Sequence, residues 1–191
     1  MITPKPFIIV VTGCPGSGKT TLSHQLADAL HLPVLSRDEF KEGYVHTMGG
    51  SHDSLGKDVN GHLNDIFFET VAFASSKKIS LVIEAAFQYS VWKPRLRSLA
   101  NAATISLVVC SIDPHLARER CRKRALADSA RERFHGDKPA LAAKEGSEAP
   151  IGQYAPLDSD IPTILVDTTN GYHPSIEEVI TIVTHPRNRG I

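Results

Sequence analysis

The residues best suited to chemistry lie near the N-terminus, where Gly13–Thr20 reads GCPGSGKT and matches G-x-x-x-x-G-K-[ST] at every fixed position. Glycines in this pattern let successive backbone N–H groups converge on phosphate oxygens, and the positive end of the following helix adds to the attraction. Lys19 would reach the β- and γ-phosphates, and the hydroxyl of Thr20 would ligate Mg²⁺. The pattern therefore predicts a site for a nucleoside triphosphate with magnesium. The residues expected to line it are Gly13, Cys14, Pro15, Gly16, Ser17, Gly18, Lys19, Thr20 and Thr21.

Two carboxylates occur where they could join this site. Asp38 follows one short apolar run, and Glu84 ends another. Because ligands of an open parallel sheet bind beyond the carboxyl ends of its strands, Thr20, Asp38 and Glu84 are expected to converge on one magnesium–phosphate centre. Glu84 is interpreted as a magnesium partner through water or as a substrate contact, and the alternative is an acid that merely ends a strand. For Asp38 the alternative is a helix N-cap.

These groups need elements that hold them together, and the rest of the sequence alternates predicted strands with predicted helices. Short β-branched apolar runs, typical of strands buried on both faces, lie at 7–11, 33–36, 79–83, 104–110 and 163–166. Helical spacing of apolar residues lies at 22–30, 61–78, 91–102, 114–126 and 175–183. Asp113 is the predicted N-cap of the fourth helix, with Pro114 at its first position. The predicted fold class is α/β, a five-stranded parallel sheet with helices on both faces.

Two segments interrupt this alternation. Residues 42–60 are rich in Gly, His, Ser and Asp, and residues 127–160 combine Gly, Pro and Ala with many charges. Both are longer than usual connections, and long irregular stretches in compact domains are often functional loops or lids. We interpret residues 42–64 as an insert that binds the second substrate and residues 127–150 as a lid. Surface insertions without a role are the alternative.

Length and composition limit the class of protein. The 191 residues suit one domain spanning 1–191, and 21 basic against 21 acidic side chains do not suit a nucleic-acid coat protein. No apolar run approaches the roughly 20 residues needed to cross a bilayer, and the N-terminus lacks the features of a secretory signal. The three cysteines form neither a disulfide framework nor a zinc spacing. A cytoplasmic protein is expected.

Other classes of nucleotide-binding protein lack their signatures here. A regulatory GTPase would carry N/T-K-x-D after a late strand, whereas residues 166–172 read VDTTNGY. A large motor or transporter ATPase would need a longer chain and a strand that ends in adjacent acids. The class that remains is a small kinase built on the phosphate-binding loop.

The loop GCPGSGKTT between a strand and a helix, followed by LSRDEF at residues 35–40, resembles the small P-loop kinases. The resemblance is to their branch of zeta toxins, polynucleotide kinases and chloramphenicol phosphotransferases, with its AAA-type ATP-binding domain. It implies the P-loop NTPase fold, kinase activity, and ATP and Mg²⁺ as ligands. It also implies that Asp38 lies opposite the γ-phosphate and accepts the proton of the substrate hydroxyl. Lys19 and Asp38 would then both be catalytic.

An arginine-rich segment follows the fourth predicted strand. Residues 113–135 contain seven basic and four acidic side chains, a local charge of +3. In the kinases that the chain resembles, arginines of this helix and of the lid clamp the triphosphate, since the forked guanidinium suits phosphate oxygens. The resemblance favours Arg120 and Arg124, one helical turn apart, as catalytic groups, with Arg124 also a nucleotide ligand. Arg131 or Arg133 would join them from the lid, and a solvated charged face is the alternative.

Two later groups have weaker signals. Thr168 follows the fifth strand, where the related kinases place backbone contacts to adenine, which favours ATP as the nucleotide. His135 would contact substrate or phosphate, although a lone loop histidine is more often exposed to solvent.

The leading hypothesis is an ATP-dependent phosphotransferase that moves the γ-phosphate to a hydroxyl of a small molecule, such as a sugar, a nucleoside or an antibiotic. The polar side chains of residues 42–64 suit such an acceptor. A polynucleotide 5′-hydroxyl kinase would need a basic groove, but residues 36–64 hold three basic and five acidic side chains, so nucleic acid is not an expected partner. A nucleotide-sugar kinase and a non-kinase ATP-binding switch stay open. No membrane partner is expected, and the protein would be a monomer or a homodimer.

Overall fold

The five apolar runs of the sequence form one parallel sheet. The computed structural model describes residues 4–51, 54, 58–86, 89–128, 130–135 and 161–185. The strand order is β2-β3-β1-β4-β5, and each neighbouring pair is parallel. The strands are β1 (Phe7–Gly13), β2 (Val34–Ser36), β3 (Leu81–Glu84), β4 (Thr104–Ser111) and β5 (Thr163–Asp167). The predicted fold class is confirmed.

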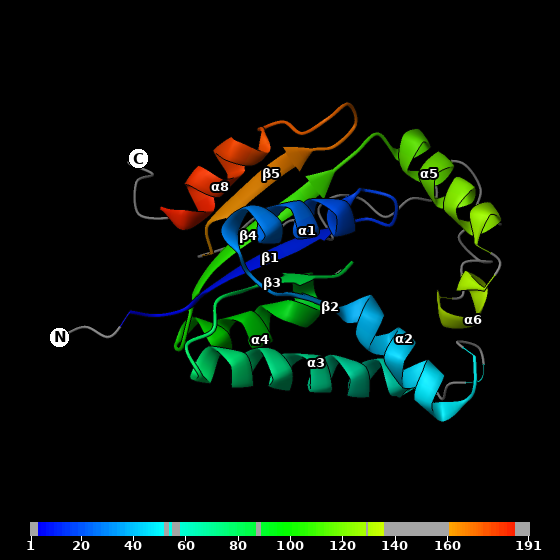
Figure 1. The fold of residues 1–191 in the computed structure, drawn as a ribbon, viewed down its shortest axis with the longest axis horizontal. Helices are drawn as coiled ribbons and strands as arrows, with labels where there is room; N and C mark the ends of the chain where they lie inside the picture. Colours follow the sequence, from blue (N-terminus) through cyan, green and yellow to red (C-terminus); the bar gives the residue numbers. More distant parts are fainter. Residues whose placement is uncertain are drawn as a thin grey trace.

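Helices cover both faces of this sheet (Figure 1). They are α1 (Lys19–Leu30), α2 (Arg37–Met48), α3 (Val59–Ser76), α4 (Tyr89–Ala100), α5 (Pro114–Ala127), α6 (Arg131–His135) and α8 (Ile176–Thr184). Alternate residues of β1 enter the two halves of the core, as the two-residue period of a strand requires. Ile8 and Val10 pack with α3 and α4, whereas Ile9 and Val11 pack with α1 and α8. None of the described helices has the length and apolarity needed to cross a bilayer.

The register of the sheet decides which strand ends meet. Glu84 lies beside Val11 of β1 on one side and beside Ser36 of β2 on the other. The carboxyl ends of β2, β3 and β1 therefore lie next to one another, at the edge where the phosphate-binding loop begins. In Figure 1, α2, α5 and α6 also lie at this end of the molecule.

The expectation of an irregular segment over residues 42–60 is wrong at both ends of the segment, which are helical, and residues 52, 53 and 55–57 lie outside the described residues. Helix α2 extends to Met48 and ends at Gly49, which has a left-handed φ of 73°, and α3 begins at Val59. Only Lys41 and Val45 of α2 are fully buried, and Phe40 is partly buried against the core, so the helix shows little of the apolar periodicity that sequence patterns reveal.

The structure describes only part of the predicted lid, residues 127–150, but it describes all of the predicted start of α5. Residues 131–135 form the short helix α6, while residues 136–150 of the expected lid lie outside the described residues. At the start of α5 the prediction is confirmed. Asp113 is the N-cap, its Oδ1 accepts a hydrogen bond from the backbone N–H of Leu116 at 3.0 Å, and Pro114 is the first helical residue.

Candidate active site

The loop between β1 and α1 has the backbone of an anion-binding turn. Gly18 caps α1 in the left-handed region, with φ 78°, and no capping side chain satisfies the first N–H groups of the helix. Gly16 also has a left-handed φ, 81°, and a Cβ there would overlap the backbone carbonyl of Ala117 on α5. Only glycine fits between the loop and that helix. The N–H groups are thus left for a ligand such as a phosphate.

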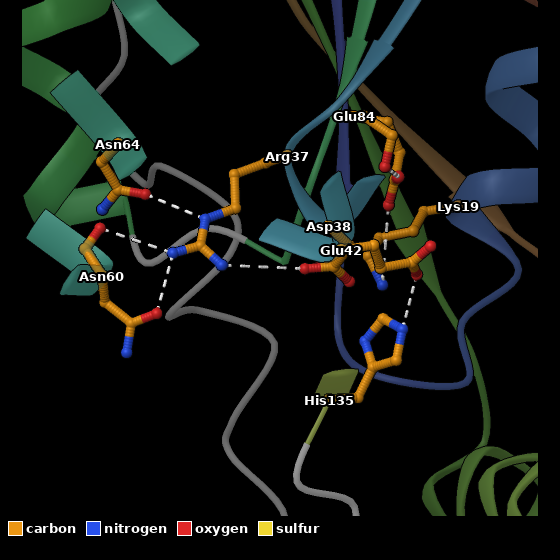
Figure 2. Close-up of polar contacts among 9 residues, drawn as sticks. Lys19, Arg37, Asp38, Glu42, Asn60, Asn64, Glu84 and His135 are labelled. Carbon is orange, nitrogen blue, oxygen red and sulfur yellow. Dashed lines mark hydrogen bonds and ion pairs between the residues drawn. The ribbon is translucent and has the colours of Figure 1, made fainter. Parts of the chain in front are cut away.

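Lys19 and Glu84 meet beneath this loop (Figure 2). Lys19 Nζ lies 3.8 Å from Glu84 Oε1, and the hydroxyl of Ser36 donates a hydrogen bond of 2.9 Å to Glu84 Oε2. The Glu84 side chain is only 1% exposed. Burial raises the pKa of Glu84, while the charge of Lys19 and the hydrogen bond from Ser36 act in the opposite direction.

The same group of residues fits a magnesium ion. Glu84 Oε1 is buried and accepts no hydrogen bond from the described residues, and the hydroxyl of Thr20 is close enough to Glu84 to lower its pKa slightly. Hydroxyl and carboxylate oxygens suit this hard cation, which usually keeps several waters and binds through phosphates. In the described ranges no three His, Cys, Asp or Glu side chains group into a metal site. Magnesium would therefore depend on the nucleotide for most of its ligands.

Asp38 lies in the first turn of α2, after the N-cap Ser36, so the interpretation of Asp38 as a helix cap is wrong. Its side chain is 42% exposed, and its negative charge raises the pKa of Glu84, which places the two carboxylates within electrostatic range. Figure 2 shows the Asp38 carboxylate paired with Arg37, in the same region as the pair of Lys19 and Glu84. The structure thus brings the candidate base and the candidate phosphate ligands together.

Arg37 was not among the site residues predicted from the sequence. Its side chain is held by hydrogen bonds to two residues of α3. Its Nε donates to Asn64 Oδ1 at 3.1 Å, and its Nη2 donates to Asn60 Oδ1 at 3.0 Å and to the main-chain oxygen of Asn60 at 3.4 Å. Arg37 Nη1 lies 4.0 Å from Asp38 Oδ1. The sequence feature that could have pointed to this contact is the four-residue spacing of Asn60 and Asn64, which puts both side chains on the same face of a helix.

A second pairing joins α6 to α2. His135 Nε2 lies 2.6 Å from Glu42 Oε1, and the histidine side chain is 9% exposed. Arg133 Nε donates to the carbonyl of Gly50 at 3.0 Å. The expectation that His135 is exposed to solvent is therefore wrong. Its partner lies 93 positions away, so no local pattern could reveal the pair.

The two predicted clamp arginines differ in position. Arg120 lies against the phosphate-binding loop, because a Cβ on Gly18 would be 3.8 Å from its Nη1, and its Nη2 donates to the carbonyl of Thr168 at 3.1 Å. Arg124 is exposed, and its described polar contact is to Cys121 Sγ at 3.9 Å. Arg120 is thus next to the loop, whereas Arg124 lies one turn farther along α5.

Thr168 supports the loop with its side chain. The hydroxyl is buried, donates to the carbonyl of Ser17 at 2.7 Å and lies 3.0 Å from the carbonyl oxygen of Ser111. The hydroxyl of Ser17 is also buried and makes no hydrogen bond to the described residues. The backbone contact of Thr168 to adenine stays a prediction.

The other loop residues vary in exposure. Pro15, Thr20 and Thr21 are exposed, and Cys14 is partly buried. Burial raises the pKa of the Cys14 thiol, which keeps it in its neutral form.

Several solved structures are similar to this chain. A protein from Chloroflexus aurantiacus that carries the provisional description of kinase is 27% identical over all of both chains, with a TM-score of 0.74. The APS kinase of Mycobacterium tuberculosis, solved with AMPPNP and APS, is 17% identical over 95% of this chain and 97% of its own, with a TM-score of 0.62. A gluconokinase from Sinorhizobium meliloti is 16% identical over 96% of this chain and 95% of its own, with a TM-score of 0.57. The last two likenesses show a shared fold.

Among curated proteins no sequence match was found. The family model described as AAA domain matches residues 8–143, from β1 through the arginine-bearing helix α5 and beyond α6. The five-stranded parallel sheet and the glycine-rich loop agree with that match. The chain therefore belongs to the AAA domain family and has the P-loop NTPase fold.

Proposed function

We propose that the protein is an ATP-dependent phosphotransferase that moves the γ-phosphate of ATP to a hydroxyl group of a small molecule. The observation that carries this proposal is the position of Asp38. A partly exposed carboxylate at the start of α2 lies at the same sheet edge as Lys19 and the buried Glu84. A nucleotide-binding switch has no use for a proton acceptor there.

Each group has a role in the proposed transfer. The loop N–H groups and Lys19 would hold the phosphates, and Thr20 and Glu84 would hold Mg²⁺. The ion neutralises charge on the β- and γ-phosphate oxygens when bound. The acceptor oxygen bonds to the γ-phosphorus as the bond from phosphorus to the bridging oxygen breaks, ADP leaves, and Asp38 takes the hydroxyl proton. Arg120 and Arg124 would stabilise the charge of the transferring group.

Two further points support this proposal. The structural neighbours include an APS kinase and a gluconokinase, so the fold is used by kinases of small molecules. The residues around Asp38 are polar and of mixed charge, which suits a small polar acceptor. We place the protein near the zeta-toxin, polynucleotide-kinase and chloramphenicol-phosphotransferase branch on the segment Ser36–Asp38.

The test is an acceptor screen with γ-labelled ATP and Mg²⁺ over pools of sugars, nucleosides, antibiotics, nucleotide sugars and 5′-hydroxyl oligonucleotides. With the acceptor found, Asp38→Asn should keep nucleotide binding and lose about 100-fold or more of the transfer rate, the usual contribution of a general base. Glu39→Gln, an exposed acid next to it on α2, should transfer normally.

Three results would change the proposal. Equal activity of Asp38→Asn and the parent would remove Asp38 as the base. Label on oligonucleotides alone would identify a polynucleotide kinase. Slow ATP hydrolysis that no acceptor stimulates and that Asp38→Asn leaves unchanged would favour a nucleotide-binding switch.

A further inference from the structure

The hydrogen bonds of Arg37 orient its side chain without neutralising it. All three acceptors on Asn60 and Asn64 are uncharged amide oxygens. Arginine stays protonated in proteins, and the side chain here is only 13% exposed. Burial lowers the pKa of Arg37, whereas Asp38 raises it. The site thus holds a positive charge partly removed from water, an arrangement that a bound anion would stabilise.

A second arginine that contacts α3 differs from Arg37 in how its charge is balanced. Arg95 lies on α4 and contacts α3, where its Nη2 pairs directly with Asp65 Oδ1 at 2.5 Å. Arg37 has its described carboxylate partner, Asp38, at 4.0 Å, beyond hydrogen-bond distance. The charge of Arg95 is therefore satisfied within the protein, and that of Arg37 is only partly balanced.

The unused part of the Arg37 guanidinium faces the candidate base. Nε and Nη2 donate to α3, whereas Nη1 donates no hydrogen bond to the described residues and is the nitrogen nearest Asp38 (Figure 2). A molecule whose hydroxyl lies at Asp38 would present its neighbouring atoms to Nη1. Asn60 and Asn64 keep the planar guanidinium in that orientation before anything binds, which lowers the entropy cost of binding.

From this geometry we propose that Arg37 binds an oxyanion group of the acceptor, a carboxylate or a phosphate, a few bonds from the hydroxyl that is phosphorylated. The proposal rests on the proposed function and adds a substrate class to it. Arg37 is then the residue that selects anionic over neutral acceptors. Asn60 and Asn64 are positioning residues that act through it.

The experiment compares acceptors in matched pairs that differ in the charged group. Suitable pairs are gluconate with glucitol, glycerate with glycerol, and a nucleoside 3′-phosphate with the nucleoside, which also separates carboxylate from phosphate. For the pair that is used, kcat/KM should be about 10- to 100-fold higher for the anionic member, the range expected of a hydrogen bond to a charged group.

Variants separate binding from folding. Arg37→Gln should remove most of the preference, because it should raise KM for the anionic acceptor by far more than it changes kcat/KM for the neutral member. Arg37→Lys should recover part of the preference, since it keeps the charge without the fork. Arg95→Gln is the matched control and should keep the full preference. Equal use of both members, or a loss in Arg37→Gln that affects both members alike, would overturn the proposal.

A binding measurement distinguishes failure of this inference from failure of the proposed function. Each anionic compound is titrated calorimetrically into the protein loaded with AMPPNP. Binding to the parent that Arg37→Gln loses, without any transfer, would support the Arg37 site and count against the phosphotransferase. Transfer to neutral compounds alone would support the phosphotransferase and overturn the Arg37 site. Absence of both binding and transfer would overturn both.

Discussion

At the scale of single residues, the candidate site contains a carboxyl group kept out of water. Glu84 is 1% exposed, accepts a hydrogen bond from the Ser36 hydroxyl and lies 3.8 Å from the Lys19 ammonium group. Burial outweighs both and raises the pKa above the ordinary value of 4.5. The ionised form is therefore held at a cost in free energy, which a nearby cation offsets.

This balance predicts that ionisation of Glu84 destabilises the nucleotide-free protein as the pH rises. A carboxyl group whose pKa is higher in the folded than in the unfolded chain binds its proton more tightly when folded. Ionisation of Glu84 therefore does not change the free energy of unfolding below about pH 4.5, where the group is protonated in both states. As the pH rises through the raised pKa, ionisation lowers the free energy of unfolding. The glutamine of Glu84→Gln cannot ionise, so the variant should not show this decrease in the free energy of unfolding.

Thermal unfolding of the parent and of Glu84→Gln over about pH 4 to 8 measures the effect. The Tm of the parent relative to the variant should fall as the pH increases. Glu69→Gln, an exposed site on α3, should give a difference that does not change with pH. A relative Tm of the parent that rises with pH would contradict the assignment.

At the scale of elements, the start of α5 determines where Arg120 lies. Asp113 caps the helix at Leu116, and its own backbone N–H donates to the hydroxyl of Thr169 at 3.2 Å. Helix α8 has a comparable start, a capping box of Ser175 and Glu178, but carries no candidate site residue. Removing each cap in turn can therefore distinguish the effect of helix stability from the effect of helix position on the site.

We predict that Asp113→Ala and Ser175→Ala each lower the free energy of unfolding by about 1 kcal/mol, as the loss of an N-cap does. Only Asp113→Ala should weaken nucleotide binding, because α5 holds Arg120 against the phosphate-binding loop. Urea denaturation and titration with AMPPNP measure the two effects. Equal weakening of AMPPNP binding by both variants would point to general destabilisation and leave Arg120 without support.

At the scale of the whole molecule, the loop is joined to several elements that are distant in sequence. Gly16 packs against α5, the carbonyl of Ser17 accepts from Thr168 after β5, and Lys19 lies 3.8 Å from Glu84 at the end of β3. A ligand in the loop therefore contacts the point where sheet and helices meet. Binding there should stabilise the folded chain as a unit.

A non-hydrolysable ATP analogue with Mg²⁺ at 100 times its Kd should raise the free energy of unfolding by about 2.7 kcal/mol. Lys19→Ala should lose most of this gain at the same concentration, and Lys77→Ala, exposed at the end of α3, should keep it. Thermal unfolding with and without EDTA gives the contribution of the metal. An equal gain in EDTA would contradict the assignment of magnesium to Thr20 and Glu84.

The sequence by itself determined the features that depend on neighbours along the chain. The eight residues of the phosphate-binding loop form one turn, so their types and spacing are enough to identify it. The strands follow from unbroken β-branched runs, since a parallel sheet is buried on both faces. Asp38 and Glu84 were predictable because each ends or follows a strand, and parallel strands end at one edge. Helix α2 was missed because only Lys41 and Val45 of it are buried.

The tertiary structure alone decided how the side chains of the site pair. Ser36 with Glu84, Arg37 with Asn64, and Glu42 with His135 are separated by 48, 27 and 93 positions. These contacts depend on the register of β2 beside β3 and on how α2 packs against α3 and α6. No period or motif encodes such geometry, because each pair forms only when elements distant in the chain are brought together by burial of the core.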